Sequence, residues 1–159
     1  MSVLIIAEHD NNILKSSTLN TISAALKLSD DIHLLILGSK IENLCKNTQS
    51  IHKVSKILKC DNEKLENFIP EIMAPIVSNI AKNYTHVLAP ASTFGKNLLP
   101  RVSALLDVTQ ISDVIEILSE NTFVRPIYAG NAISQVETNQ NINLLTIPVS
   151  YTHLRAHET

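Results

Sequence analysis

The chain has 159 residues, of which 45% are hydrophobic and 18% charged, a balance typical of one soluble globular domain with its own core. Its net charge of −2 excludes a broad electrostatic surface for nucleic acid, and an aromatic content of 4% without tryptophan argues against a base-stacking platform. No apolar run approaches the roughly 20 residues that span a bilayer, so we expect neither nucleic-acid binding nor membrane insertion.

The first third of the sequence alternates short apolar runs with helical patterns. Val3–Ala7 is an unbroken apolar run, typical of a strand buried on both faces, and Ile32–Leu37, which ends in Gly38-Ser39, is predicted as a second buried strand. Between them, Ser17–Leu28 has the spacing of a helix, and weaker patterns predict a short helix over Ile41–Thr48 and a third strand over Val54–Leu58. The residues expected on the buried stripe of the first helix are Leu19, Ile22, Ala25 and Leu26.

Prolines interrupt the next two helical patterns. Apolar residues recur at helical spacing from Leu65 to Ile80, and Pro75 predicts a break or kink within that helix. A fourth buried strand, His86–Ala89, leads through a polar loop into another apolar helix. Pro100 is best accommodated in the first turn of that helix, so we expect the helix to begin near Asn97.

After Asp107 the pattern changes to a run of strands separated by short turns. The alternating first part predicts a parallel sheet, which the later strands would extend with antiparallel members in a single α/β domain. The later strands are expected over Ile111–Leu118, Phe123–Tyr128, Ala132–Glu137 and Leu144–Ile147.

Two polar loops follow predicted strands at the edge where α/β proteins bind ligands. The loop Ala91–Lys96 has hydroxyls, a glycine and a lysine near a helix start, which suit a phosphate, but it lacks the spacing of a P-loop. The alternative is a tight connector whose Lys96 is solvated or pairs with another chain. Similarly, Glu8-His9-Asp10 could contact a ribose or an adenine, or could be only a polar loop.

No residue pattern specifies catalysis. Ser92, His86 and Asp107 could be assembled into a nucleophilic triad, but His86 is expected inside a buried strand and no G-x-S-x-G elbow surrounds the serine. The carboxylates of Asp107, Asp113 and Glu116 are scattered, without a spacing that indicates acid–base chemistry. An acyl hydrolase is therefore the weakest of the functional hypotheses, and we predict no catalytic residues.

Metal binding is not indicated either. Cys45 and Cys60 are too far apart in sequence for a metal-type pair and are interpreted as reduced thiols. His153 and His157 could share a helix face, but they lack a further ligand.

The stretch from Phe123 to Ala132 is the second distinctive segment. Arg125 and Tyr128 would point to opposite faces of a regular strand, and Gly130-Asn131 suits a tight turn or bulge. We interpret the arginine and the tyrosine as residues that tie strands together or contact a partner surface.

Two long segments resemble a known family. TFGKNLLPRVSALLDVTQISDVIEI followed by TFVRPIYAGNAISQVE is similar to the N-terminal domain of electron transfer flavoprotein alpha subunits. SVLIIAEHDNN at the start and FIPEIMAPIVSNIAKNYTHVLAP in the middle also resemble that family, so the similarity extends from about Val3 to Ile147.

The resemblance implies a three-layer Rossmann-like fold of the adenine nucleotide alpha hydrolase type. It also implies a beta subunit as partner, in a heterodimer that carries one FAD. That heterodimer would take electrons from acyl-CoA and related dehydrogenases, as in fatty acid beta-oxidation, and pass them to a quinone oxidoreductase. In that family the FAD is held mainly by a second, C-terminal domain of the alpha subunit, so none is expected to bind here. The location would be cytoplasmic in a bacterium and the mitochondrial matrix in a eukaryote.

In the family's beta subunit, AMP lies beside a Thr-Gly-Gln at the matching helix start. This chain has Leu98, Leu99 and Pro100 there, so the resemblance implies a closed site and a scaffold role, with no cofactor-binding residues. A free-standing adenine-nucleotide-binding module is the alternative. The domain is expected over residues 1–147, and residues 148–159 are expected to be a disordered or non-native tail where the family would continue into its flavin domain.

Overall fold

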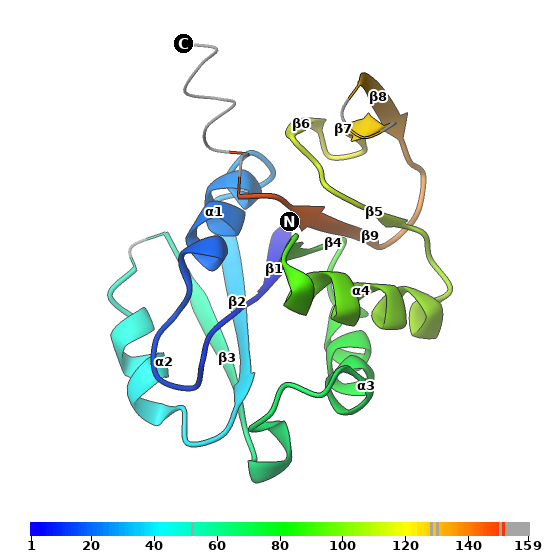
Figure 1. The fold of residues 1–159 in the computed structure, drawn as a ribbon. Coiled ribbons are helices and arrows are strands. Elements are labelled where there is room, and N and C mark those ends of the chain that lie inside the picture. The colour runs from blue at the N-terminus through cyan, green and yellow to red at the C-terminus, as the bar shows by residue number, and fades with distance from the viewer. Residues whose placement is uncertain (52, 128, 130, 150, 152–159) are drawn as a thin grey trace.

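A six-stranded sheet forms the centre of the molecule (Figure 1). The computed structural model describes residues 1–51, 53–127, 129, 131–149 and 151. The strand order is β3-β2-β1-β4-β9-β5, and each pairing between described residues is parallel. The six strands are β1 (Ser2–Ile6), β2 (Asp31–Gly38), β3 (Lys56–Asp61), β4 (His86–Pro90), β5 (Gln110–Ile111) and β9 (Asn143–Ile147).

Helices cover both faces of this sheet, which gives three layers. In β1, the side chains of Val3 and Ile5 belong to the core with α1 and α2, whereas Leu4 and Ile6 belong to the core with α3 and α4. This division explains why β1 is an unbroken apolar run: both of its faces are buried. The predicted Rossmann-like α/β fold is confirmed. The helices are α1 (Ser16–Ala25), α2 (Glu42–Thr48), α3 (Pro70–Ala81) and α4 (Thr93–Leu106), with a short 3₁₀ turn at Glu63–Leu65.

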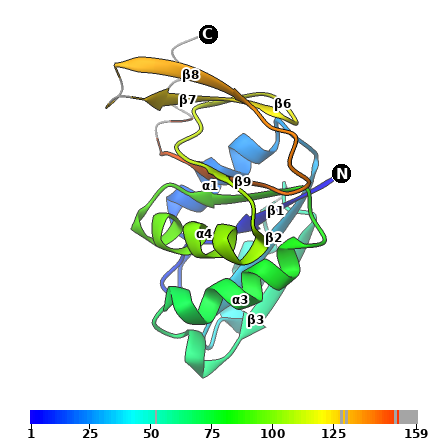
Figure 2. The same ribbon diagram turned by 90° about the vertical axis from the view of Figure 1, so that its right-hand side faces the viewer.

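The sequence predicted that antiparallel strands would extend the parallel sheet. They form instead a separate sheet at one end of the molecule (Figure 2). The predicted strand Ile111–Leu118 is divided because the chain turns at Asp113, whose φ is 54°. The small sheet packs on the core through the buried side chains of Ile117 and Phe123. Its strands are β6 (Glu116–Ser119), β7 (Thr122–Ile127) and β8 (Ala132–Glu137).

The two helices that contain an interior proline differ from the predicted ones: α3 begins at Pro70 rather than at Leu65, whereas α4 is longer than predicted. The helix α3 begins with Pro70 and runs through Pro75 without a break, and α4 begins at Thr93 rather than near Asn97, so that Pro100 lies well inside it. A proline leaves the carbonyl group of the residue four positions earlier without its helical partner. Because Pro75 and Pro100 are exposed, water can reach that side of each helix.

Two smaller predictions also need correction. Leu19 was expected on the buried stripe of α1, but it is 47% exposed, and the buried positions include Thr18 and Thr21 instead. Both threonine hydroxyls form hydrogen bonds within the fold, so their burial costs little free energy. The third strand is Lys56–Asp61, shifted from the predicted Val54–Leu58, because its edge position leaves it half exposed and weakly patterned.

Candidate functional site

A cleft of about 240 Å³ opens at the carboxyl ends of β1 and β4. After β1 the chain turns toward α1 and β2, and after β4 it turns toward α4 and β5 on the other side, so the loops after these neighbouring strands diverge. Such a switch point is where open α/β sheets bind ligands. The strand order therefore makes this cleft the candidate functional site.

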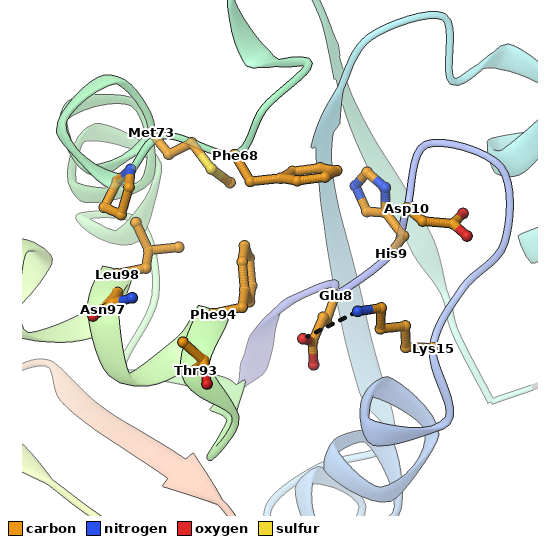
Figure 3. A pocket seen from close by; sticks show the side chains of 11 residues that line it. Glu8, His9, Asp10, Lys15, Phe68, Met73, Thr93, Phe94, Asn97 and Leu98 are labelled. Carbon is orange, nitrogen blue, oxygen red and sulfur yellow. Dashed lines mark ion pairs between the residues drawn. The ribbon is translucent and has the colours of Figure 1, made fainter.

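The two sides of the cleft differ in character (Figure 3). Apolar side chains of the α3 and α4 region line one side, and polar side chains of the β1–α1 loop line the other. The apolar side includes Phe68, Met73, Phe94 and Leu98, and the polar side includes Glu8, His9, Asp10 and Lys15.

The carboxylate of Glu8 is bound by residues of its own loop and helix. It accepts a hydrogen bond of 2.6 Å from the Ser17 hydroxyl, and the Lys15 ammonium lies 3.8 Å away. The hydroxyl of Thr18 exchanges two hydrogen bonds with the backbone of Glu8. These contacts fix the loop against the start of α1, so the Glu8 carboxylate has a structural role.

His9 is buried, and both ring nitrogens have partners. The backbone N–H of Asn11 donates to Nδ1 at 2.9 Å, so Nε2 carries the proton and donates to the Leu37 carbonyl at 2.8 Å. Burial lowers the pKa of His9 below its ordinary value of 6.5, which favours the neutral ring.

Asp10 serves the turn in which it lies. Its carboxylate accepts from the backbone N–H groups of Ile13 and Asn12, and the bond from Ile13 is the main reason that its pKa is lowered. The Glu8-His9-Asp10 segment is thus used for the loop's own structure, as the polar-loop interpretation requires.

The predicted phosphate loop is the cap of α4. The Ser92 hydroxyl accepts from the Gly95 N–H at 3.4 Å, and the Lys96 ammonium lies 3.7 Å from Asp113 of the same chain. Lys96 therefore has a partner within the domain. Among the residues that line the cleft, the Glu8 carboxylate faces it beside the Lys15 ammonium, whereas the Asp10 carboxylate points away from it (Figure 3), so the lining presents no surplus of positive charge for a phosphate.

The residues expected to close the site lie deeper in α4 than the family resemblance implied. Since α4 begins at Thr93, Leu98, Leu99 and Pro100 belong to its second turn and not to its start. Leu98 lines the cleft, Leu99 is completely buried in the core, and Pro100 is exposed. Only Leu98 of the three can influence what enters.

The structure does not bring the hypothetical triad together. His86 begins β4, whereas Ser92 follows the other end of that strand, a separation of roughly 20 Å for six extended residues. Asp107 is the C-cap of α4. His86 is buried, and its Nε2 bonds the Glu120 carbonyl at 2.6 Å, so its role is to join β4 to the small sheet.

Arg125 ties two parts of the domain together. Its Nε donates to the Ser112 carbonyl at 2.9 Å, which joins β7 to the connection between β5 and β6. Of the other residues singled out in this segment, Tyr128 and Gly130 lie outside the described residues, and Asn131 lies in a turn directly before β8.

Other groups supply no further site in the part of the chain that the structure describes. Within those ranges no cluster of three metal-ligating side chains occurs, and Cys45 and Cys60 are free. No described helix has the length and apolarity needed to cross a membrane. Of the predicted tail, Tyr151 is buried in the core on the α1 side, while His153 and His157 lie outside the described residues.

Sequence reasoning missed Phe68 as a cleft residue, because it fits the helical spacing that begins at Leu65. Phe68 instead lies before α3, with a φ of 55°, and its ring meets the His9 ring edge-on at a centroid distance of 5.1 Å. Pro70 was the available signal, because a proline favours the first position of a helix and disfavours helical backbone just before it.

Comparison with known proteins adds a second line of information. A family described as "Electron transfer flavoprotein domain" matches residues 3–152. The chain is 47% identical over 147 residues to the electron transfer flavoprotein subunit alpha of Pseudomonas aeruginosa. The matched region covers 92% of this chain and 48% of that protein. The chain is 42% identical over 152 residues to the mitochondrial subunit alpha of Dictyostelium discoideum, with 91% and 43% covered. The corresponding Arabidopsis thaliana subunit is 43% identical over 155 residues, with 92% and 43% covered. The chain thus spans less than half the length of these relatives.

Proposed function

The chain belongs to the electron transfer flavoprotein family, and we propose that it is the N-terminal scaffold and docking domain of an alpha subunit. Its partner would be the beta subunit, in a heterodimer that carries FAD. That complex would move electrons from acyl-CoA and related dehydrogenases to a quinone oxidoreductase, in the bacterial cytoplasm or the mitochondrial matrix. The domain itself would act as part of an electron carrier and not as an enzyme.

The observation that best supports a scaffold role is the internal use of the cleft's polar groups. Glu8 is engaged by Ser17 and Lys15, and both nitrogens of His9 are bonded to backbone groups. A cofactor would have to break these contacts or bind through apolar side chains alone. We therefore propose that FAD is held by the part of the relatives that this chain does not span, and that no residue here binds it directly.

For domain organisation, we propose that residues 1–147 form the scaffold domain. We assign no separate function to residues 148–159.

Flavin binding tests the first part of this proposal. Purified chain mixed with FAD should be colourless after desalting, whereas yellow colour retained at one equivalent would contradict the scaffold role. A full-length relative with its beta subunit, treated in the same way, is the positive control.

Co-purification tests the docking part. Untagged beta subunit expressed with the tagged chain should elute with it, and should not elute with an unrelated tagged α/β domain of similar size. Failure to co-purify, with both proteins folded and in solution, would contradict docking by this domain.

A second candidate function is a free-standing adenine-nucleotide module, which the position of the cleft at the switch point favours. The Glu8 carboxylate, which lines the cleft, opposes it. Calorimetry with AMP and with ATP separates the hypotheses, because micromolar binding would support the module and a flat titration would support the scaffold.

A further inference from the structure

His9 joins three segments that are far apart in the sequence. Its ring donates to the Leu37 carbonyl at the end of β2 and accepts from Asn11 in its own loop. The ring also contacts Phe68 of the β3–α3 connection edge-on. One imidazole therefore holds together the β1–α1 loop, the end of β2 and the β3–α3 connection at the carboxyl edge of the sheet, beside the cleft.

The bond at Nδ1 permits only one protonation state. A backbone N–H can donate but cannot accept, so the Asn11 N–H requires an unprotonated Nδ1. Adding a proton to this nitrogen would place two N–H groups against each other at a separation that is now 2.9 Å. The protonated ring cannot keep its present position.

His86 provides an internal comparison, because it is also buried and also bonds a carbonyl through Nε2. Its Nδ1, however, faces the Thr85 hydroxyl at 3.0 Å. A hydroxyl can donate to a neutral ring and can rotate to accept from a protonated one. Protonation of His86 is therefore tolerated by its contacts, whereas protonation of His9 is not.

The loop that His9 anchors holds further contacts through Asn11. The Asn11 side chain accepts from the Ser39 N–H at 3.0 Å and donates to the Glu66 carbonyl at 3.1 Å. Asn11 itself has a φ of 74°, a conformation maintained by its surroundings. If the His9–Asn11 bond is lost, the links to the β2–α2 loop and to the β3–α3 connection are weakened together.

We propose that His9 is an acid-sensitive latch: protonation at Nδ1 expels the ring, releases the β1–α1 loop and opens the cleft beside Phe68. The charged groups that act on His9 come from its own loop, where Asp10 and Glu8 favour the protonated ring and Lys15 opposes it. From the other elements packed against it, β2 presents the Leu37 carbonyl and the β3–α3 connection presents the Phe68 ring. Burial is the largest influence and lowers the pKa of His9. The latch therefore stays closed at neutral pH and opens only at a lower pH.

Hydrogen exchange of single amides in the 159-residue chain tests the latch. After correction for the intrinsic dependence on pH, the amides of Asn11 and Ser39 should lose protection by about tenfold or more between pH 7.5 and pH 5. The amide of Ile32, held by the Ser55 hydroxyl, should keep its protection over that range and serves as the reference. His9→Gln can still donate to the Leu37 carbonyl but has no Nδ1 to accept from Asn11, so Asn11 and Ser39 should be equally unprotected at both pH values in this variant, whereas His86→Gln should leave the acid-induced loss unchanged.

Three results would overturn the proposal: equal protection of Asn11 and Ser39 at both pH values, the same acid-induced loss in His9→Gln, or a loss shared by Ile32. If His9→Gln does not fold, the ring nitrogens of the wild-type chain decide the matter by ¹⁵N chemical shift. The Nδ1 of His9 should titrate with the same midpoint as the amides of Asn11 and Ser39. A His9 ring that stays neutral until the whole chain unfolds would refute the latch.

Discussion

Gly95, in the first turn of α4, lies directly against the carbonyl oxygen of Pro90, the last residue of β4. A Cβ atom at Gly95 would be 1.8 Å from that oxygen, which no side chain can accommodate. The helix therefore begins as close to the strand as a backbone allows, and this requires glycine. The close approach places the cap residue Ser92 and the cleft residue Phe94 at the carboxyl edge of the sheet.

Gly95→Ala should destabilise the domain, although alanine is normally the better helix former. The added methyl group must push α4 away from β4, and overpacking of this kind costs about 1–3 kcal/mol. Urea unfolding followed by circular dichroism measures the change in the free energy of unfolding. Asn97→Ala, at an exposed position of the same helix, is the control and should be neutral or slightly stabilising. A Gly95→Ala chain as stable as the wild type would show that the strand and helix can separate freely.

Phe123→Ala should remove the larger of the two buried side chains, Ile117 and Phe123, through which the small antiparallel sheet packs on the core. The side chain is completely buried in the main core and meets the His86 ring at a centroid distance of 6.3 Å, so its loss should cost about 3–5 kcal/mol. Thermal unfolding measures this loss. Ile133→Ala removes a side chain that is 68% exposed on β8, and it should stay within about 0.5 kcal/mol of the wild type. Similar effects of the two substitutions would contradict anchoring through Phe123.

Stability should fall as the pH is lowered below about 6.5. Burial lowers the pKa of both His9 and His86 from the ordinary value of 6.5, so the unfolded chain binds protons at a higher pH than the folded chain does. The free energy of unfolding therefore decreases as the pH falls through that range, and it is unaffected by these groups above it. The urea midpoint at pH 7.5, 6.5 and 5.5 measures the slope.

The carboxylates with lowered pKa values should not contribute to that slope, because they titrate below their ordinary value of 3.8. The double variant His9→Gln, His86→Gln should accordingly show a flatter dependence between pH 7.5 and 5.5. An unchanged slope would assign the pH dependence to other groups.

Asn11→Gly should loosen the carboxyl edge without straining the backbone. Glycine keeps the φ of 74° but removes the side-chain bonds to Ser39 and Glu66, so the loss should be about 1–2 kcal/mol. Differential scanning calorimetry measures it, and Asn12→Gly in the same exposed turn controls for backbone flexibility. A larger effect at position 12 than at position 11 would contradict the role of Asn11 as a link.

Much of the architecture could be predicted from local patterns. The run Val3–Ala7 is apolar at every position, and Ile32–Leu37 is apolar except for His33, a pattern typical of strands buried on both faces. Two parts of the fold were predicted less well. The bounds of β3 were shifted because it is a half-exposed edge strand, and the run after Asp107 was assigned to one sheet although its strands belong to two.

The sequence by itself determined the α/β class, the buried strands and the family resemblance, because these depend on residue identity and spacing along the chain. Only the tertiary structure decided that Pro75 and Pro100 lie inside helices, because that depends on which face of each helix water reaches. The tertiary structure likewise decided which hydrogen bonds the His9 ring makes and where its proton lies, because its partner Leu37 is 28 residues away in sequence. A hydrogen bond across that separation depends on how strands are placed side by side, which no local pattern specifies.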